Sequence, residues 1–346
     1  MGPRARTSPA VSDDAVGTSV DLDLYGLGAR ISGDWPEVVE SLRLDFAWFA
    51  RPLAVAPQLE VVIERRPPEL DSMGNLSASF VTPRNVVYQD GGRTVIDYFG
   101  QAVSVLDRAA QRLVIQGEDE GVLHQAGYLF LLSRLGEHLD ARGLPRLHGL
   151  GLAGADGGVV TLLPSGGGKT SLALEALRSS GVKLISEDSP LIDRRGRLHP
   201  LPLRIGIHPD EAARVGEQDL RRIDRMEFGP KLAIEVSSFR DRIATEPVPL
   251  RHLVIGQRRL GTEARLEQVP RRVAIGPLFR EAVVGVGLYQ GMEFVLQRGI
   301  SDVRHHAGTA IMRALWCAIG LGQAKVWRLE TGRDHERNWA ALRRLL

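Results

Sequence analysis

Short apolar or alternating runs, which are typical of β-strands, fill the region from residue 20 to about 118. The clearest runs are 58–64, 93–99 and 111–116, and Pro-Pro and Gly-Gly pairs between such runs favour turns. The segment that follows instead repeats leucines and Tyr128 at helical spacing, which predicts a helix over 121–142. We therefore expect a β-rich N-terminal region at 20–118, suited to docking a substrate, and a connecting helical segment at 119–145.

From residue 146 to 346 the pattern changes to alternating strands and helices. Predicted strands lie at 159–163, 182–185, 203–207, 253–256 and 324–329, and predicted helices at 168–180, 275–298, 303–319 and 334–346. This alternation indicates an α/β domain with a central sheet flanked by helices. Residues 1–19 are small and polar, and we expect them to form a disordered tail.

Composition excludes some classes of protein. The 346 residues carry 44 Lys+Arg and 42 Asp+Glu, so a net charge of +2 favours neither nucleic acid nor an anionic membrane as partner. Cys317 is the only cysteine, which excludes an intrachain disulfide and a cysteine-based zinc site. The sequence shows no secretory signal and no apolar run long enough to span a bilayer, and we therefore expect a cytoplasmic protein.

A glycine-rich turn between a predicted strand and a predicted helix carries the most chemistry. The residues are Pro164, Ser165, Gly166, Gly167, Gly168, Lys169, Thr170 and Ser171. Glycines let backbone N–H groups approach phosphate oxygens, and the start of the helix adds further unpaired N–H groups. The lysine can reach the β- and γ-phosphates, while the Thr170 hydroxyl can bind Mg²⁺. Residues 165–171 are therefore candidates for binding ATP, although such a turn can also bind nothing.

Two other features lie close to this motif in the sequence. Glu187 and Asp188 end the next predicted strand, on the side of the sheet where ligands bind in α/β proteins. One carboxylate could hold Mg²⁺ and the other could accept a proton. His148 precedes the strand of the glycine motif. Taken alone, the acidic pair could be an ordinary turn and the histidine a structural one.

Together, the His148-Gly149 pair, the 164–170 turn and the Glu187-Asp188 pair resemble the catalytic domain of HPr kinase/phosphorylase over residues 146–207. They are similar, more distantly, to the P-loop of phosphoenolpyruvate carboxykinase. The resemblance implies a P-loop kinase core of this type, with ATP and Mg²⁺ as ligands. It assigns Lys169 to the phosphates and Glu187 to proton exchange with a substrate serine. It also assigns Thr170 and Asp188 to the metal, and makes His148 the group that tunes the catalytic carboxylate.

The chain departs from the family pattern at several positions. Leu163 stands where the first glycine of the motif is expected, and Glu187 stands where the family commonly has Asp. Pro202 replaces a glutamate associated with a further Mg²⁺, whereas Arg204 remains and could contact phosphate. These changes indicate a diverged relative with an acceptor other than HPr.

Arg271 and Arg272 are further candidates for contacts with phosphate or substrate, with a solvated surface pair as the alternative.

The sequence thus predicts a serine-kinase-type phosphotransferase. Its expected acceptor is a Ser or Thr hydroxyl of a peptide or small protein, including precursor peptides of natural products. One alternative is a kinase whose acceptor is a small molecule. Another is a nucleotide-binding scaffold without catalysis, which Leu163 and Pro202 would favour. The assemblies of the family also imply a homo-oligomer.

Overall fold

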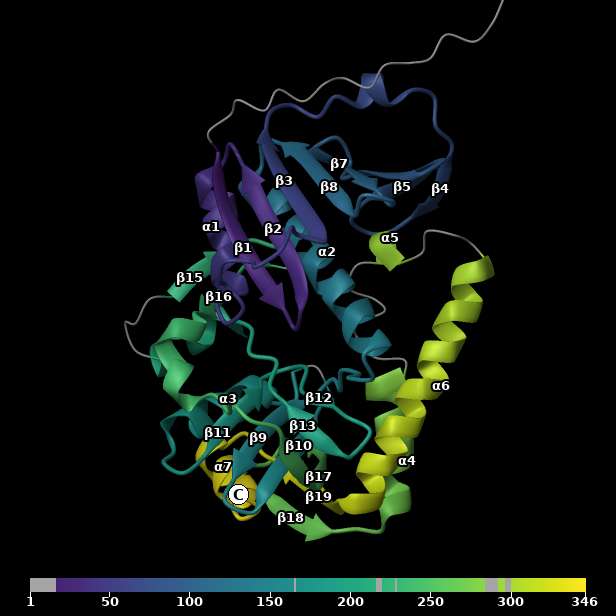
Figure 1. The fold of residues 1–346 in the computed structure, drawn as a ribbon. Helices are drawn as coiled ribbons and strands as arrows, with labels where there is room; N and C mark the ends of the chain where they lie inside the picture. The colour runs from purple at the N-terminus through teal and green to yellow at the C-terminus, as the bar shows by residue number, and fades with distance from the viewer. Residues whose placement is uncertain (1–16, 165, 216–219, 228, 284–291, 296–299) are drawn as a thin grey trace, which may run out of the picture.

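The computed structural model describes residues 17–164, 166–215, 220–227, 229–283, 292–295 and 300–346. In these residues the chain is a mixed α/β protein with two large sheets and one small one (Figure 1). The N-terminal sheet and the C-terminal sheet lie at opposite ends of the view, and the long helix α2 lies between them.

The N-terminal sheet has eight strands and curves into a half-barrel. In order across the sheet, they are β1 (Thr18–Leu24), β2 (Leu27–Gly33), β3 (Leu59–Arg65), β8 (Arg112–Gly117), β7 (Ala102–Asp107), β6 (Arg93–Asp97), β5 (Val86–Asp90) and β4 (Ala78–Val81). The β2–β3 and β3–β8 pairs are parallel, and the other neighbours are antiparallel. A 3₁₀ turn, η1 (Leu70–Met73), lies between β3 and β4.

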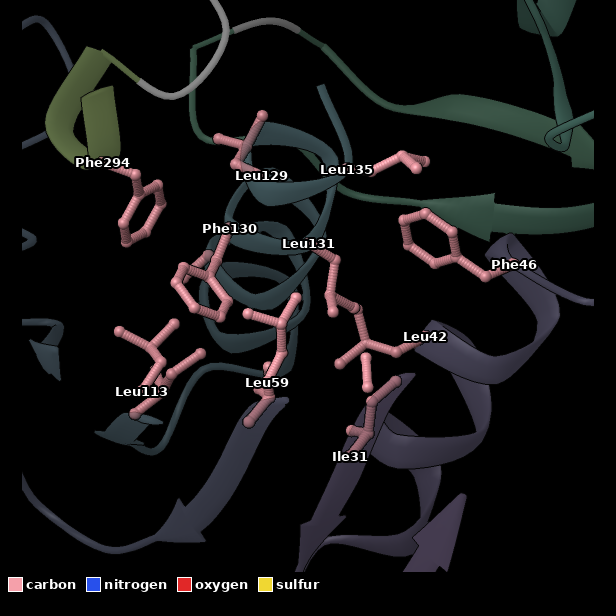
Figure 2. Close-up of a cluster of buried hydrophobic side chains, with 14 of the residues drawn as sticks. Ile31, Leu42, Phe46, Leu59, Leu113, Leu129, Phe130, Leu131, Leu135 and Phe294 are labelled. Carbon is pink, nitrogen blue, oxygen red and sulfur yellow. The ribbon is translucent and has the colours of Figure 1, made fainter. Parts of the chain in front are cut away.

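Two helices contribute to the core of this half. They are α1 (Pro36–Asp45) and α2 (Glu120–Ala141), whose first turn is capped by the Asp119 carboxylate accepting from the Val122 N–H. Leu42 and Phe130 belong to the resulting apolar cluster, which also includes Ile31 and Leu113 from the sheet (Figure 2). Because α2 is buried around most of its circumference, it contacts elements on more than one side.

The C-terminal sheet contains the glycine motif. Across it run β11 (Lys183–Ser186), β9 (Leu150–Gly154), β10 (Gly157–Leu162), β17 (Val248–Arg258), β19 (Lys325–Thr331) and β18 (Arg265–Gln268). The start of β17 also pairs with β13 (Arg197–His199), which pairs with β12 (Leu191–Ile192). A small third sheet holds β14 (Ile205–Ile207), β16 (Lys231–Ile234) and β15 (Leu220–Ile223).

Helices cover both faces of the C-terminal sheet because its central strands are apolar on both sides. Val159 of β10 belongs to the cluster that contains residues of α3 (Lys169–Arg178) and α7 (His335–Arg343). The next residue, Val160, belongs to the cluster with α4 (Ile275–Leu278) and α6 (Ile300–Gln323). The remaining short segments are α5 (Met292–Val295), η2 (Pro209–Arg214), η3 (Val236–Arg242), η4 (Arg271–Ala274) and η5 (Phe279–Val283).

Most of the predicted elements are confirmed within a few residues, including the 121–142 helix and the strand and helix around the glycine motif. The helix predicted over 275–298 is confirmed as helical at 275–283 and 292–295, where α4, η5 and α5 lie, and its other residues are outside the described part of the chain. The predicted tail at 1–19 is two residues too long, since Thr18 already belongs to β1, and residues 1–16 lie outside the described part of the chain. The helix α1 interrupts the β-rich region and was not predicted.

No helix in the described part of the chain combines the length and apolar character needed to cross a bilayer.

Candidate functional site

One edge of the C-terminal sheet gathers the predicted site residues. Strands β10 and β17 run parallel, whereas β9 is antiparallel to both β10 and β11. Strands β10, β11 and β17 therefore all end at this edge, and β9 begins there. The edge consequently receives the glycine turn after β10, Glu187 and Asp188 after β11, and His148 before β9.

The glycine turn has a backbone that requires glycine. Gly166 has φ +71° and Gly168 has φ +102°, in a region that side-chain-bearing residues rarely adopt. A Cβ on Gly166 would meet no atom within 4 Å, and one on Gly168 would lie 3.7 Å from the nearest atom, Nη1 of Arg258. Gly168 also precedes α3, whose first N–H groups have no acceptor within the helix. The turn thus exposes a set of backbone donors toward open space.

Lys169, His148 and Asp188 form a continuous polar chain. Lys169 Nζ donates to the Leu163 carbonyl at 2.9 Å and lies 3.0 Å from His148 Nε2, while His148 Nδ1 lies 3.1 Å from Asp188 Oδ1. Because an ammonium only donates, His148 accepts through Nε2 and carries its proton on Nδ1, facing Asp188. This arrangement fixes the tautomer of the histidine and holds the lysine beside the glycine turn.

A second pair links Thr170 to Glu187. The Thr170 hydroxyl donates to Glu187 Oε1 at 2.6 Å. Burial, together with the neighbouring charge of Asp188, raises the pKa of Glu187 from 4.5 to about 7. Partial burial opposes ionisation of Asp188 as well, but contact with His148 and the charge of Lys169 hold the pKa of Asp188 below its ordinary 3.8. The two adjacent carboxyl groups therefore have pKa values shifted in opposite directions, as is typical of acid–base sites.

These residues line a cavity of about 720 Å³. Its walls come from both halves of the molecule: Tyr128 and His124 lie on α2, and Arg84 follows β4 of the N-terminal sheet. The volume falls in the range of small-molecule sites, roughly 300–1,000 Å³. Several basic residues of the wall were not singled out from the sequence, among them Arg84, Arg146, Lys231, Arg258 and Arg313.

Arg258 lies beside the glycine turn, and the charge of Lys231 acts on the acidic pair. Arg258 ends β17, the strand beside β10, and its guanidinium faces Gly168. Lys231 begins β16, and its charge counteracts the rise in the pKa of Glu187. The side chain of neither residue makes a hydrogen bond or an ion pair with the described residues. Each is an isolated basic residue in the sequence, so only the strand order brings it to the site.

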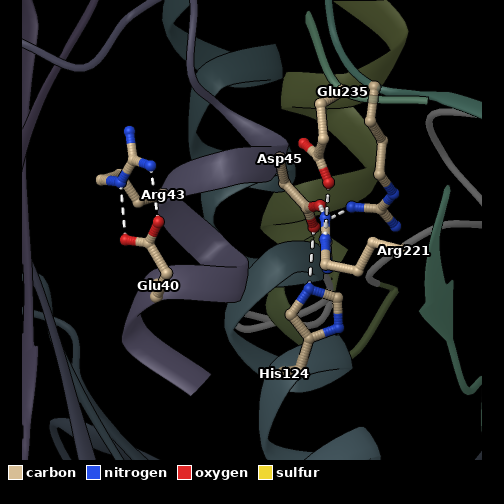
Figure 3. Close-up of polar contacts among 7 residues, drawn as sticks. Glu40, Arg43, Asp45, His124, Arg221 and Glu235 are labelled. Carbon is tan, nitrogen blue, oxygen red and sulfur yellow. Dashed lines mark hydrogen bonds and ion pairs between the residues drawn. The ribbon is translucent and has the colours of Figure 1, made fainter. Parts of the chain in front are cut away.

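Arg204 lines the cavity but is engaged elsewhere. Its guanidinium pairs with the buried Asp45 and lies over the Tyr128 ring, 4.1 Å from the ring centroid. Asp45 also contacts Arg221 and, at 2.8 Å, His124 Nε2 (Figure 3). A carboxylate from the end of α1 thus neutralises the arginine that the sequence offered as a phosphate contact. The structure gives Arg204 the role of fixing the cavity wall.

The remaining predicted residues lie less centrally. Ser171 lines the cavity and its hydroxyl donates to Glu211 Oε1 at 3.0 Å, whereas Ser165 lies outside the described residues. Arg271 and Arg272 are placed in η4 and do not line the cavity, and Arg271 Nε donates to the Ala324 carbonyl at 3.2 Å. The structure thus places both arginines away from this cavity, and their contact with phosphate or substrate stays a prediction.

Neither a scan against protein-family models nor a search of curated proteins finds a match for this chain.

Proposed function

We propose that this protein is an ATP-dependent phosphotransferase with a P-loop core of the HPr kinase type, and that it phosphorylates a Ser or Thr hydroxyl of a peptide or small protein. One observation carries the proposal. The two pairs that the site places together, Thr170 with Glu187 and His148 with Asp188, join a glycine-rich phosphate turn to adjacent carboxyl groups of opposite pKa shift. Such a site can hold phosphates and remove a proton.

The phosphate end of the site fits a nucleoside triphosphate. Gly166 and Gly168 have positive φ values, and because they carry no Cβ, the space beside their backbone stays open. The start of α3 directs unpaired N–H groups to the same place. Lys169, Lys231 and Arg258 line the cavity, and none of the three is paired with a carboxylate among the described residues. This surplus of positive charge suits a polyanion.

The residues also fit Mg²⁺ as the metal that accompanies ATP. No group of three or more His, Cys, Asp or Glu side chains within the described ranges could form a complete metal site. Mg²⁺ at nucleotide sites usually takes only one or two protein ligands and completes its shell with phosphates and water. The Thr170 hydroxyl and the adjacent carboxylates would hold it, and the ion would neutralise charge on the phosphates.

The side chains of this protein would then share the remaining work. Glu187 accepts the proton of the acceptor hydroxyl, since a base with a pKa of about 7 is half deprotonated near neutral pH. Asp188 holds His148 in one tautomer, and His148 in turn positions the ammonium of Lys169. The acceptor would enter from the α2 side, where Tyr128 and Gln125 extend the cavity toward Arg84 of the N-terminal half. This wall supports a peptide acceptor docked by the β-rich region.

The test is transfer of label from γ-labelled ATP in the presence of Mg²⁺ to a library of Ser- and Thr-containing peptides and to free hydroxy compounds. Lys169→Ala is expected to abolish transfer, because it removes the phosphate-binding ammonium. Lys183→Ala is the matched control, since Lys183 is exposed and donates to the Asp241 carbonyl away from the cavity. Full activity of Lys169→Ala would refute the proposal, and label only in free hydroxy compounds would replace the peptide with a small molecule.

A further inference from the structure

The short segment before β9 carries two side chains that line the cavity. Arg146 and His148 both line it, whereas Leu147 between them is 1% exposed and belongs to the apolar core. Arg146 also forms an isolated antiparallel bridge with Leu191. Arg146 therefore accompanies His148 in the wall of the cavity.

The guanidinium of Arg146 lies at the α2 end of the cavity. A Cβ on Gly136 of α2 would come within 2.2 Å of Arg146 Nη2, so the guanidinium lies directly against the backbone of that helix. Tyr128, on the same helix, also lines the cavity. The glycine at 136 thus provides the room in which the arginine is held, away from the glycine-rich turn that faces Lys169.

Three other arginines of the wall are paired with carboxylates, whereas Arg146 is paired with none in the described part of the chain, although the charges of Asp140 and Asp188 act on it. Arg313 pairs with Asp140, Arg204 pairs with Asp45, and Arg84 pairs with Glu227 and Glu293. The side chain of Arg146 makes no hydrogen bond and no ion pair with the described residues, although it is half-buried and burial lowers its pKa. An arginine stays charged in proteins, and a buried charge without a partner is unfavourable until an anion binds.

We propose that Arg146 binds a carboxylate of the acceptor, so that the phosphorylated Ser or Thr lies beside an acidic residue of its peptide. This inference rests on the proposed phosphotransferase function and names the class of its acceptor. In the proposed reaction Glu187 accepts the hydroxyl proton, and Arg146 lines the same cavity. A guanidinium in that wall can recognise a carboxylate of the peptide near the hydroxyl, through a charge-assisted and often bidentate contact.

Peptide binding tests this without relying on catalysis. Labelled serine peptides that differ only in Glu, Gln or Lys at positions within three residues of the serine are titrated against the full-length protein with Mg²⁺ and a non-hydrolysable ATP analogue. Binding is followed by fluorescence polarisation, and phosphate transfer is measured separately with ATP. The variants are Arg146→Gln, Arg146→Glu and Gly136→Ala, which would displace the guanidinium without removing its charge. Arg142→Gln, at an exposed arginine outside the cavity wall, is the control.

The Glu peptide is expected to bind about 10- to 100-fold more tightly than the Gln peptide, the range of a charged hydrogen bond. Arg146→Gln should erase that difference, Arg146→Glu should favour the Lys peptide, and Arg142→Gln should change neither. Equal binding of Glu and Gln peptides by the wild type would overturn the inference, as would binding of none of the peptides. Arg146-dependent binding without any transfer would instead preserve the inference and refute the kinase, so the two failures are distinguishable.

Discussion

The replacement Glu187→Gln separates the chemical role of this carboxyl group from its effect on stability. The pKa of Glu187 rises from 4.5 to about 7 because the group is buried and lies beside the charge of Asp188. Its charged form is therefore disfavoured in the folded protein relative to the unfolded chain. Stability contributed by this group is fully present below pH 4.5 and is lost as the pH rises through about 7.

The size of the effect follows from that difference. A tenfold change in a protonation equilibrium corresponds to about 1.4 kcal/mol, so the full penalty on charged Glu187 would be about 3 kcal/mol. Glu187 is partly exposed, and solvent reduces the penalty; we expect about 1–2 kcal/mol. Glutamine keeps an oxygen that can accept from Thr170, so the variant removes the charge with little change in shape.

Thermal unfolding of wild type and Glu187→Gln between pH 4 and 8 measures this. The variant should melt about 2–4 °C above the wild type at pH 8, at about 2 °C per kcal/mol for a chain of this size. The difference should shrink as the pH falls and vanish below about pH 4.5. In the same preparations, phosphate transfer should be lost. A variant that melts below the wild type at pH 8 would contradict the assigned burial of charge, and retained transfer would exclude Glu187 as the base.

Two further predictions concern charged residues outside the sequence motif. In a titration with labelled nucleotide, Arg258→Ala is expected to weaken ATP binding by about tenfold or more, because one charge-assisted contact is lost. Arg259 pairs with Glu330 and does not line the cavity, so the control variant Arg259→Ala should bind ATP as the wild type does. Equal ATP affinities of the two variants would exclude Arg258 from the proposed phosphate site. Asp45→Asn is expected to lower the free energy of unfolding by about 3 kcal/mol or more, because it leaves buried arginines without their anion. Asp21→Asn removes a more exposed ion pair with Arg30 and should lower the free energy of unfolding by less than about 1 kcal/mol. Denaturant titration of both variants measures the two losses. Equal losses would show that the Asp45 cluster stabilises the fold no more than an exposed ion pair does.

Local pattern was enough to predict the centre of the site. The apolar run, the glycines and the following amphipathic helix place Lys169 and Thr170 correctly because each element depends on neighbouring residues. The sequence also places Glu187 and Asp188 at the end of the next predicted strand, and this places them near the glycine turn because β11 ends at the same edge of the sheet as β10. This held even though the antiparallel β9 lies between the two strands, an arrangement that alternation alone does not reveal.

Contacts distant in sequence account for what the pattern missed. Lys231 and Arg258 reach the cavity through the strand order, and no local signal distinguishes either from other basic residues of the chain. Arg204 looked available for phosphate because its partner, Asp45, lies 159 residues away on a helix that was not predicted. Arg271 and Arg272 were offered only as a basic pair, and a charge pattern alone cannot decide which side of a sheet an arginine faces.

The Asp45 cluster explains how a cavity built from two halves can have a defined wall. Apolar contacts between the N-terminal half and the rest of the chain favour burial but not one orientation. The fully buried Asp45 carboxylate contacts Arg204, Arg221 and His124. Few relative positions of the elements that carry these residues keep all of the contacts, and any other position leaves a buried charge unpaired. These partners lie on α2, on β15 and just before β14, so satisfying Asp45 fixes α1 and α2 against the small sheet. Tyr128, held under the Arg204 guanidinium, is thereby positioned opposite Glu187 and Asp188 in the cavity. If the proposed function holds, this ion cluster shapes the acceptor end of the cavity, and changes to Asp45 should alter acceptor binding before they alter the glycine turn.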